Sequence, residues 1–97
     1  MNLRARLRAR KIRSHVAIAT ELLREPQEKH YGYELSRKSG AGAVKLYPYL
    51  TKLHEAGYIE DGWEDPSDTA GRPPRRYYCL TASGKEALGR FVEQHSV

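Results

Sequence analysis

The feature that most constrains the fold of this chain is a pair of short helical segments separated by a four-residue break. The first segment covers residues 31–38, and residues 39–42 then read Ser-Gly-Ala-Gly, small residues that permit a tight turn. The second segment covers residues 43–56 and carries leucines at helical spacings of four and three: Leu46, Leu50 and Leu53. Two helices joined in this way predict a helix-turn-helix.

The ends and faces of these two helices can also be predicted. Gly57 follows the second helix, where a left-handed residue commonly ends a helix. In the first helix we expect Tyr33 and Leu35 to point inward, with basic residues filling the last turn. Pro48 lies inside the second helix, where it removes one backbone donor and predicts a kink.

Further elements flank the pair on both sides. Residues 12–24 have the apolar spacing of an amphipathic helix, which Pro26 terminates. Residues 58–64 and 76–81 read as strands, and the Pro- and Gly-rich residues between them read as a long hairpin loop. Thr81 then caps a last helix over about residues 82–95.

This order of elements predicts an α+β fold that is mainly α. We expect a winged helix-turn-helix with three helices, a two-stranded wing and a short C-terminal helix. The organisation that follows is a basic N-terminal arm (1–11), a winged helix-turn-helix domain (12–81) and a C-terminal dimerisation helix (82–97). An alternative for the arm is that it extends the first helix, because arginine and alanine are good helix formers.

Composition and charge narrow the class of function. The 97 residues carry a net charge of +5, and residues 1–13 contain six basic residues and no acid. Clustered basic charge of this kind indicates a polyanionic partner. No apolar run approaches the roughly 20 residues that span a bilayer, and no secretory signal is visible, so we expect a cytoplasmic, nucleoid-associated protein with no membrane partner.

The sequence offers little support for an enzyme or a cofactor site. The four histidines are dispersed, and none has metal-ligand spacing with another histidine or with Cys79. Cys79 is expected to be a buried strand thiol rather than a redox sensor. No phosphate-cradling glycine loop is present. We therefore expect no catalytic residue, no metal and no cofactor.

The sequence resembles a known family, the PadR-type winged helix-turn-helix transcriptional regulators. The resemblance covers about residues 12–90 in the family's order and spacing. Five stretches carry it: Tyr31-Gly32-Tyr33-Glu34-Leu35, Leu46-Tyr47-Pro48 with Leu50 and Leu53, Glu55-Ala56-Gly57-Tyr58-Ile59, Arg75-Arg76-Tyr77-Tyr78, and Leu80-Thr81-Ala82-Ser83-Gly84.

The resemblance implies a homodimer that places the second helix of the helix-turn-helix in the DNA major groove. It also implies wings near the flanking backbone or minor groove, and a last helix that packs against its counterpart. Many members are repressors. Where the family often has Ser-Pro-Gly-Thr, this chain has Gly42-Ala43-Val44-Lys45. The DNA sequence preference of other members therefore does not carry over to this chain. The sequence does not identify an effector ligand.

Specific side chains are expected to contact DNA. An outward strip on the second helix holds Lys45, Tyr49 and Lys52, whereas Tyr47 could belong largely to the core. The other expected contacts lie in the preceding helix, the wing and the arm: Lys38, Arg72, Arg75, Arg4, Arg6 and Arg8. Arg76 could instead pair with Glu60 or Glu64.

The last helix has an apolar face formed by Leu88, Phe91 and Val92. We expect these side chains to form a dimer interface, and the alternative is that they complete the core of a single chain. Trp63 on the first wing strand is expected to fill the core or an interface.

The leading hypothesis is a sequence-specific regulator that binds double-stranded DNA, acting as a dimeric repressor. A second reading is an architectural protein, or a plasmid- or phage-maintenance protein, in which the basic arm dominates binding. A third is a winged-helix module that binds another protein, for which the basic strip would be incidental.

Overall fold

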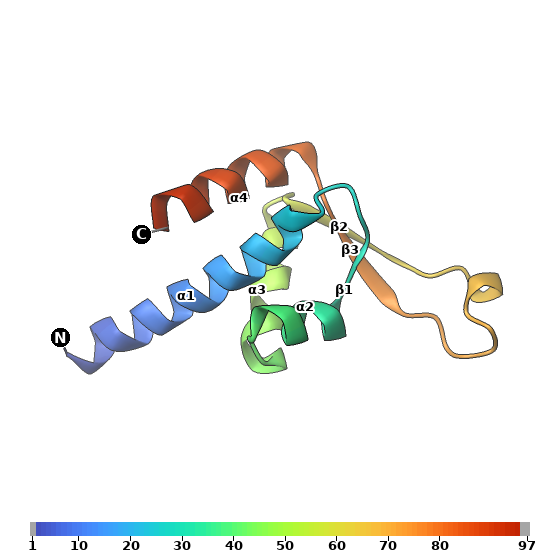
Figure 1. Ribbon diagram of the computed structural model, residues 1–97, viewed down its shortest axis with the longest axis horizontal. Coiled ribbons are helices and arrows are strands. Elements are labelled where there is room, and N and C mark those ends of the chain that lie inside the picture. Colours follow the sequence, from blue (N-terminus) through green and yellow to red (C-terminus); the bar gives the residue numbers. More distant parts are fainter. Residues whose placement is uncertain (1, 96–97) are drawn as a thin grey trace.

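The structure, a computed structural model that describes residues 2–95, combines four α-helices with a small antiparallel sheet (Figure 1). The long axis of the molecule is 52 Å and the other two axes are 26 and 22 Å. The elements follow the order α1 (Leu3–Arg24), β1 (His30–Tyr31), α2 (Gly32–Ser39), α3 (Ala43–Glu55), β2 (Ile59–Trp63), a 3₁₀ turn η1 (Pro66–Asp68), β3 (Arg76–Leu80) and α4 (Ala82–His95).

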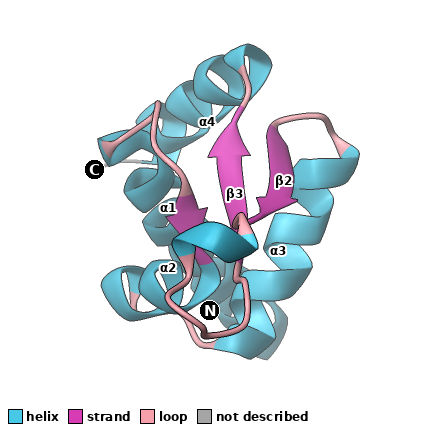
Figure 2. Cartoon of the chain, turned by 90° about the vertical axis from the view of Figure 1, so that its right-hand side faces the viewer, coloured by secondary structure: helices cyan, strands magenta, loops and turns pink. Residues whose placement is uncertain are grey.

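The sheet has three strands in the order β1-β3-β2 (Figure 2). β2 and β3 pair from Ile59 opposite Leu80 to Trp63 opposite Arg76, which confirms the predicted wing hairpin. The prediction of a two-stranded sheet missed one strand, because β1 pairs through two residues with the free edge of β3. A strand of two residues is too short to show any alternation in the sequence.

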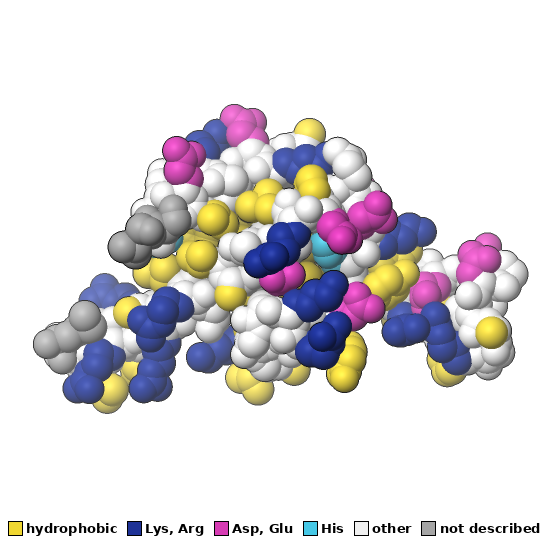
Figure 3. Space-filling model, viewed as in Figure 1, with side chains coloured by type: hydrophobic (Ala, Val, Ile, Leu, Met, Phe, Trp, Pro, Cys, Tyr) yellow, Lys and Arg dark blue, Asp and Glu magenta, His cyan; other side chains and the backbone are white. Residues whose placement is uncertain are grey.

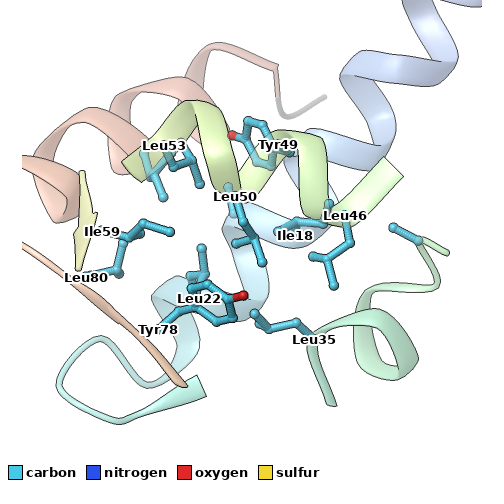
Figure 4. Packing of buried hydrophobic residues seen from close by; sticks show 13 residues of the cluster. Ile18, Leu22, Leu35, Leu46, Tyr49, Leu50, Leu53, Ile59, Tyr78 and Leu80 are labelled. Atoms are coloured by element: carbon cyan, nitrogen blue, oxygen red, sulfur yellow. The ribbon is translucent and has the colours of Figure 1, made fainter. Parts of the chain in front are cut away.

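The core is formed where α1, α2, α3 and the sheet meet (Figure 4). Ile18 and Leu22 of α1 are fully buried, and so is Leu46 of α3. Burial of one such side chain stabilises the fold by about 1.5–3 kcal/mol. The remaining large core residues are Leu35, Tyr49, Leu50, Leu53, Ile59, Tyr78, Leu80 and Leu88.

The predicted end of α3 is confirmed in detail. Gly57 has a φ of 78°, a left-handed conformation that favours glycine. Its N–H donates to the carbonyl of His54 at 3.0 Å, and the N–H of Tyr58 donates to the carbonyl of Leu53 at 2.9 Å. This pair of hydrogen bonds satisfies the last carbonyls of α3 and directs the chain into β2.

The predicted cap of α4 is present as well. The backbone N–H of Gly84 donates to Oγ1 of Thr81 at 3.0 Å. The Thr81 hydroxyl also donates to the carbonyl of Gly57 at 2.7 Å. The start of α4 is therefore attached to the end of α3.

The basic residues at the N-terminus do not form a separate arm. α1 begins at Leu3 and runs without a break to Arg24, so the alternative in which these residues extend the first helix is the one observed. The side chain of Asn2 accepts a hydrogen bond from the N–H of Ala5 at 2.8 Å and caps the helix. The N-terminal half of α1 projects away from the body of the molecule (Figure 1).

The inward orientation expected for Tyr33 is wrong, whereas that of Leu35 is confirmed. Tyr33 is 75% exposed and Leu35 is buried. Residues two apart on a helix lie on nearly opposite sides of it, so the two side chains cannot both face the core.

Candidate nucleic-acid interface

The outer face of α3 carries an exposed strip of apolar and aromatic side chains. Val44 is 88% exposed and Tyr47 is 45% exposed, while Leu46, between them in sequence, is fully buried. Thr51 follows Tyr47 by one turn on the same face and is also exposed. These three side chains therefore leave the outer face of α3 open to solvent.

Tyr49 does not belong to that surface, which corrects the predicted outward strip. It is 7% exposed, and its ring is stacked on His15 of α1 with centroids 3.9 Å apart. Burial raises the pKa of the Tyr49 phenol to about 12. The signal was present in the sequence, because Tyr49 follows Leu46 by three positions and precedes Leu53 by four, so it shares the leucine face.

The predicted lysines of α3 are both exposed, but they do not point in the same direction as Tyr47. Lys45 and Lys52 lie on the flank of α3 that faces α1, where they line a cavity together with Arg10 and Lys11. The structure therefore places these two expected contacts beside the basic half of α1.

The wing loop is held closed by Glu64. Nη1 and Nη2 of Arg72 donate to its two carboxylate oxygens at 2.7 and 2.9 Å, and the backbone N–H of Arg75 donates at 2.8 Å. The hydrogen bonds from Arg72 are the main reason that the pKa of Glu64 falls to about 2. Arg72, an expected DNA contact, is thus engaged within the wing.

The other arginines of the wing differ from Arg72. The side chain of Arg75 is exposed, its Nε lies 3.7 Å from a carboxylate oxygen of Glu64, and its guanidinium carbon lies 5.6 Å from the ring centroid of Tyr31. Arg76 forms an ion pair, as the alternative interpretation expected, but the partner is Asp61 rather than either predicted glutamate. Arg76 lies opposite Trp63 in the sheet, so it shares a face with the odd-numbered residues of β2.

Asp61 connects the wing to α3. It accepts a hydrogen bond from Nε of Arg76 at 2.6 Å, and its other oxygen lies 3.0 Å from Nε2 of His54 near the end of α3. The hydrogen bond from Arg76 lowers the pKa of Asp61 below its usual value. The orientation of α3 relative to the wing is therefore supported by a polar contact as well as by the core.

Basic side chains cluster around the projecting end of α1 (Figure 3). Arg4, Arg6 and Arg8, the expected contacts of this segment, are exposed. Lys38, in the last turn of α2, is exposed as well. The structure thus leaves the side chains of this predicted set accessible to solvent.

The apolar residues of α4 divide into two groups. Leu88 is 3% exposed and belongs to the core of the single chain, so it is not a surface residue that a partner could contact. Phe91 and Val92 are half-buried against that core. Trp63 is 66% exposed, so of the two roles expected for it the core is wrong and the interface stays a prediction.

In residues 2–95, no group of three or more His, Cys, Asp or Glu residues is arranged to hold a metal ion. No helix of the described part of the chain is long and apolar enough to cross a membrane. Cys79 is half-buried, and burial raises the pKa of its thiol.

Comparison with known proteins gives a consistent result. Among solved structures, the chain is similar to a PadR-like transcription factor from Bacteroides fragilis, with 27% identity and a TM-score of 0.69 over 94% of this chain and 87% of the other. A Streptococcus mutans protein is 25% identical, with a TM-score of 0.69 over 87% of this chain and 76% of the other.

A PadR family transcription regulator from Clostridium difficile shares the fold at 21% identity, with a TM-score of 0.64 over 84% of this chain and 91% of the other. No curated protein matches the chain significantly by sequence. The family model described as the transcriptional regulator PadR-like family matches residues 21–90. The chain therefore belongs to the PadR-like family of transcriptional regulators.

Proposed function

We propose that this protein is a sequence-specific regulator that binds double-stranded DNA, and that it acts as a dimeric repressor. The observation that carries the proposal is the exposed strip of Val44, Tyr47 and Thr51 on α3, the second helix of the helix-turn-helix. These side chains stand on a helix that the core and the contact between His54 and Asp61 hold in place.

The dimensions of α3 suit the major groove. A helix with its side chains is about 10–12 Å wide and the groove is about 12 Å wide. In this arrangement Val44 would contact apolar base edges such as thymine methyl groups, and Tyr47 would donate to a phosphate or a base. Base contacts of this kind supply sequence discrimination.

Contacts to the phosphate backbone would come from the basic residues around α3. Lys45 and Lys52 lie on one flank of the helix, Lys38 lies in the last turn of α2, and exposed arginines occupy the N-terminal half of α1. In the wing, Arg75 is the better donor, because its Nε lies 3.7 Å from the Glu64 carboxylate, whereas Arg72 holds that carboxylate through two short hydrogen bonds. Such contacts make affinity dependent on salt but carry no sequence information.

A dimer would place two copies of α3 in successive major grooves on half-sites about 10 bp apart. The half-buried residues Phe91 and Val92 are the part of α4 proposed to meet a second copy. A bound dimer would occlude a promoter, which is the basis of the proposed repression.

The architectural reading has one specific observation in its favour, the basic half of α1. Its exposed arginines could supply strong binding to any duplex without help from α3. The two readings differ in what they predict for sequence preference.

Selection of bound sequences from random duplex DNA separates these readings. The regulator proposal predicts enrichment of an inverted repeat, and Tyr47→Ala should reduce the enrichment while leaving weak binding to all duplexes. Enrichment of no motif, together with tight binding, would support the architectural reading. Absence of binding at low salt would reject both and support a protein-interaction module.

A further inference from the structure

The side chain of Tyr47 on α3 lies against the first residue of α2. Gly32 begins α2 and is buried. A Cβ at Gly32 would overlap the hydroxyl of Tyr47 and would lie only 3.0 and 3.2 Å from the Cζ and Cε1 atoms of its ring. The outer end of the Tyr47 ring therefore occupies the space that a side chain at position 32 would need.

The backbone of α2 does not itself require glycine at this position. Gly32 is helical, whereas the glycines with a left-handed backbone are Gly40, Gly57 and Gly71. Glycine is also a poorer helix former than alanine, because it loses more conformational freedom on folding. The close approach of the Tyr47 ring therefore explains the lack of a side chain at Gly32 better than the helix does.

The contact with Gly32 supports a side chain that is otherwise open to solvent. Tyr47 is 45% exposed and borders a groove of about 370 Å³ between α3 and β3. Val44, on the same face of α3, is 88% exposed. A tyrosine side chain has few rotatable bonds, so a contact at its outer end restricts the direction of the whole ring.

We propose that Gly32 is a positioning residue for DNA recognition: because it has no side chain, α2 can support the Tyr47 ring in the direction in which it meets the duplex. This inference rests on the proposed function, in which Tyr47 contacts DNA. Gly32 acts through Tyr47 and makes no DNA contact of its own. A ring that is already held before binding loses less conformational freedom on binding, so its contact contributes more to affinity.

A second contact between a glycine and a tyrosine allows a matched comparison. A Cβ at Gly62 of β2 would overlap the hydroxyl of Tyr77 and would lie 2.6 Å from its Cζ atom. These two residues lie opposite each other in the wing, on β2 and β3. The packing at Gly62 thus resembles that at Gly32, but it does not involve a side chain of α3.

The contact is tested first on the whole chain without DNA. Nuclear Overhauser effects should connect the α protons of Gly32 with the ring protons of Tyr47. In Gly32→Ala the ring signals of Tyr47 should shift, because the added methyl group displaces the ring, while those of Tyr77 should stay in place. Absence of these Overhauser effects in the unchanged chain would overturn the proposal.

The role in recognition is tested on a selected duplex and its scrambled counterpart. Gly32→Ala should weaken binding to the selected duplex by about fivefold or more, the effect of one misplaced base contact, and should change binding to the scrambled duplex by less than about twofold. Gly62→Ala is the matched control and should leave the ratio of the two affinities unchanged. Gly89→Ala, where the added Cβ meets nothing within 4 Å, is a second control on α4.

A double variant shows whether Gly32 acts through Tyr47. In the Tyr47→Ala background, Gly32→Ala should change neither affinity by more than about twofold, because no ring remains to be displaced. This background also keeps the test possible if the single variant does not fold, because it removes the overlap. A fivefold or larger effect of Gly32→Ala in this background would overturn the proposal.

The remaining outcomes separate this inference from the proposed function. An affinity ratio that Gly32→Ala leaves unchanged, or that Gly62→Ala reduces equally, would show that Gly32 is only a packing residue. Equal binding of both duplexes by the unchanged chain would instead reject the proposed function, and the role of Gly32 in recognition with it.

Discussion

The carboxylate of Glu64 at the end of β2 holds the guanidinium of Arg72 through two hydrogen bonds, 2.7 and 2.9 Å long. Parallel bonds of this type restrict both side chains, and a third hydrogen bond from the Arg75 backbone closes the base of the loop. Glu64 therefore gives the wing its shape, although the sequence indicated it only as an alternative partner of Arg76.

Replacing Glu64 should change how the wing meets DNA. In Glu64→Gln the pair with Arg72 loses its charge, and the guanidinium becomes free to contact a phosphate. We expect the slope of log affinity against log salt to steepen by about 0.9, the value for one added contact. Asp68→Asn, a neutralisation elsewhere in the loop, is the control, and an equal effect of both variants would argue against the pairing.

The pKa of Glu64 also predicts the response of the wing to acid. Because the folded-state pKa is about 2, below the usual value of 4.5, the pairing stabilises the fold above the unfolded pKa. This contribution is lost as the pH falls from about 4.5 through 2. NMR titration of the Glu64 carboxyl carbon should show its midpoint near 2, and a midpoint near 4.5 would contradict the contact.

The two tyrosines of α3 should separate stability from binding. Tyr49→Ala removes a buried ring, so we expect it to lower the free energy of unfolding by about 3–5 kcal/mol. Tyr47→Ala removes a side chain that is 45% exposed and should cost much less stability but weaken binding to the selected duplex. Urea unfolding and fluorescence anisotropy measure the two effects, and the reverse pattern would contradict the orientation of α3.

Two glycines of α4 offer a second matched pair. A Cβ at Gly84 would overlap the backbone carbonyl of Tyr58, whereas a Cβ at Gly89 would meet nothing within 4 Å. Gly84→Ala should therefore destabilise the fold by about 3 kcal/mol or more. Gly89→Ala should stabilise it by about 0.5–1 kcal/mol through helix propensity. Thermal unfolding of both variants checks the docking of α4, and equal effects would show that α4 does not approach Tyr58 closely.

His15 should make stability depend on pH near neutrality. Its folded-state pKa is lowered below 6.5, so the unfolded chain binds a proton more readily than the folded chain does. The stabilising contribution is complete above about pH 6.5 and decreases as the pH falls through the lower folded value.

Urea unfolding at pH 5.5 and 7.5 measures this dependence. His15→Phe retains an aromatic ring beside Tyr49 and should reduce the loss of stability at the lower pH. His95→Gln removes an exposed histidine and serves as the control. A loss of stability that is the same in His15→Phe as in the original chain would contradict the burial of this histidine.

Elements with clear periodicity or capping chemistry were predicted well from the sequence. The leucines of α3, the left-handed Gly57 and the Thr81 cap all lie where the sequence placed them, because each depends on local rules. The family resemblance was likewise carried by short local motifs, and the family match supports it.

Contacts between distant parts of the chain could not be predicted. The ion pairs of Arg72 with Glu64 and of Arg76 with Asp61 depend on which residues lie opposite each other in the β2–β3 hairpin. No local sequence pattern shows that register. Strand β1 was missed because two residues have no periodicity. The orientation of Tyr49, by contrast, could have been predicted. Its spacing from Leu46 and Leu53 places it on the buried face of α3, and the predicted outward strip overlooked that spacing.

The measurement that tests the central claim most directly is a salt titration of affinity for a selected duplex and for its scrambled counterpart. A sequence-specific regulator predicts that the selected duplex binds at least about 10³-fold more tightly at physiological salt. It also predicts that Tyr47→Ala removes most of this gap and leaves the affinity for scrambled DNA nearly unchanged. Equal affinities with the same steep salt dependence for both duplexes would contradict the claim.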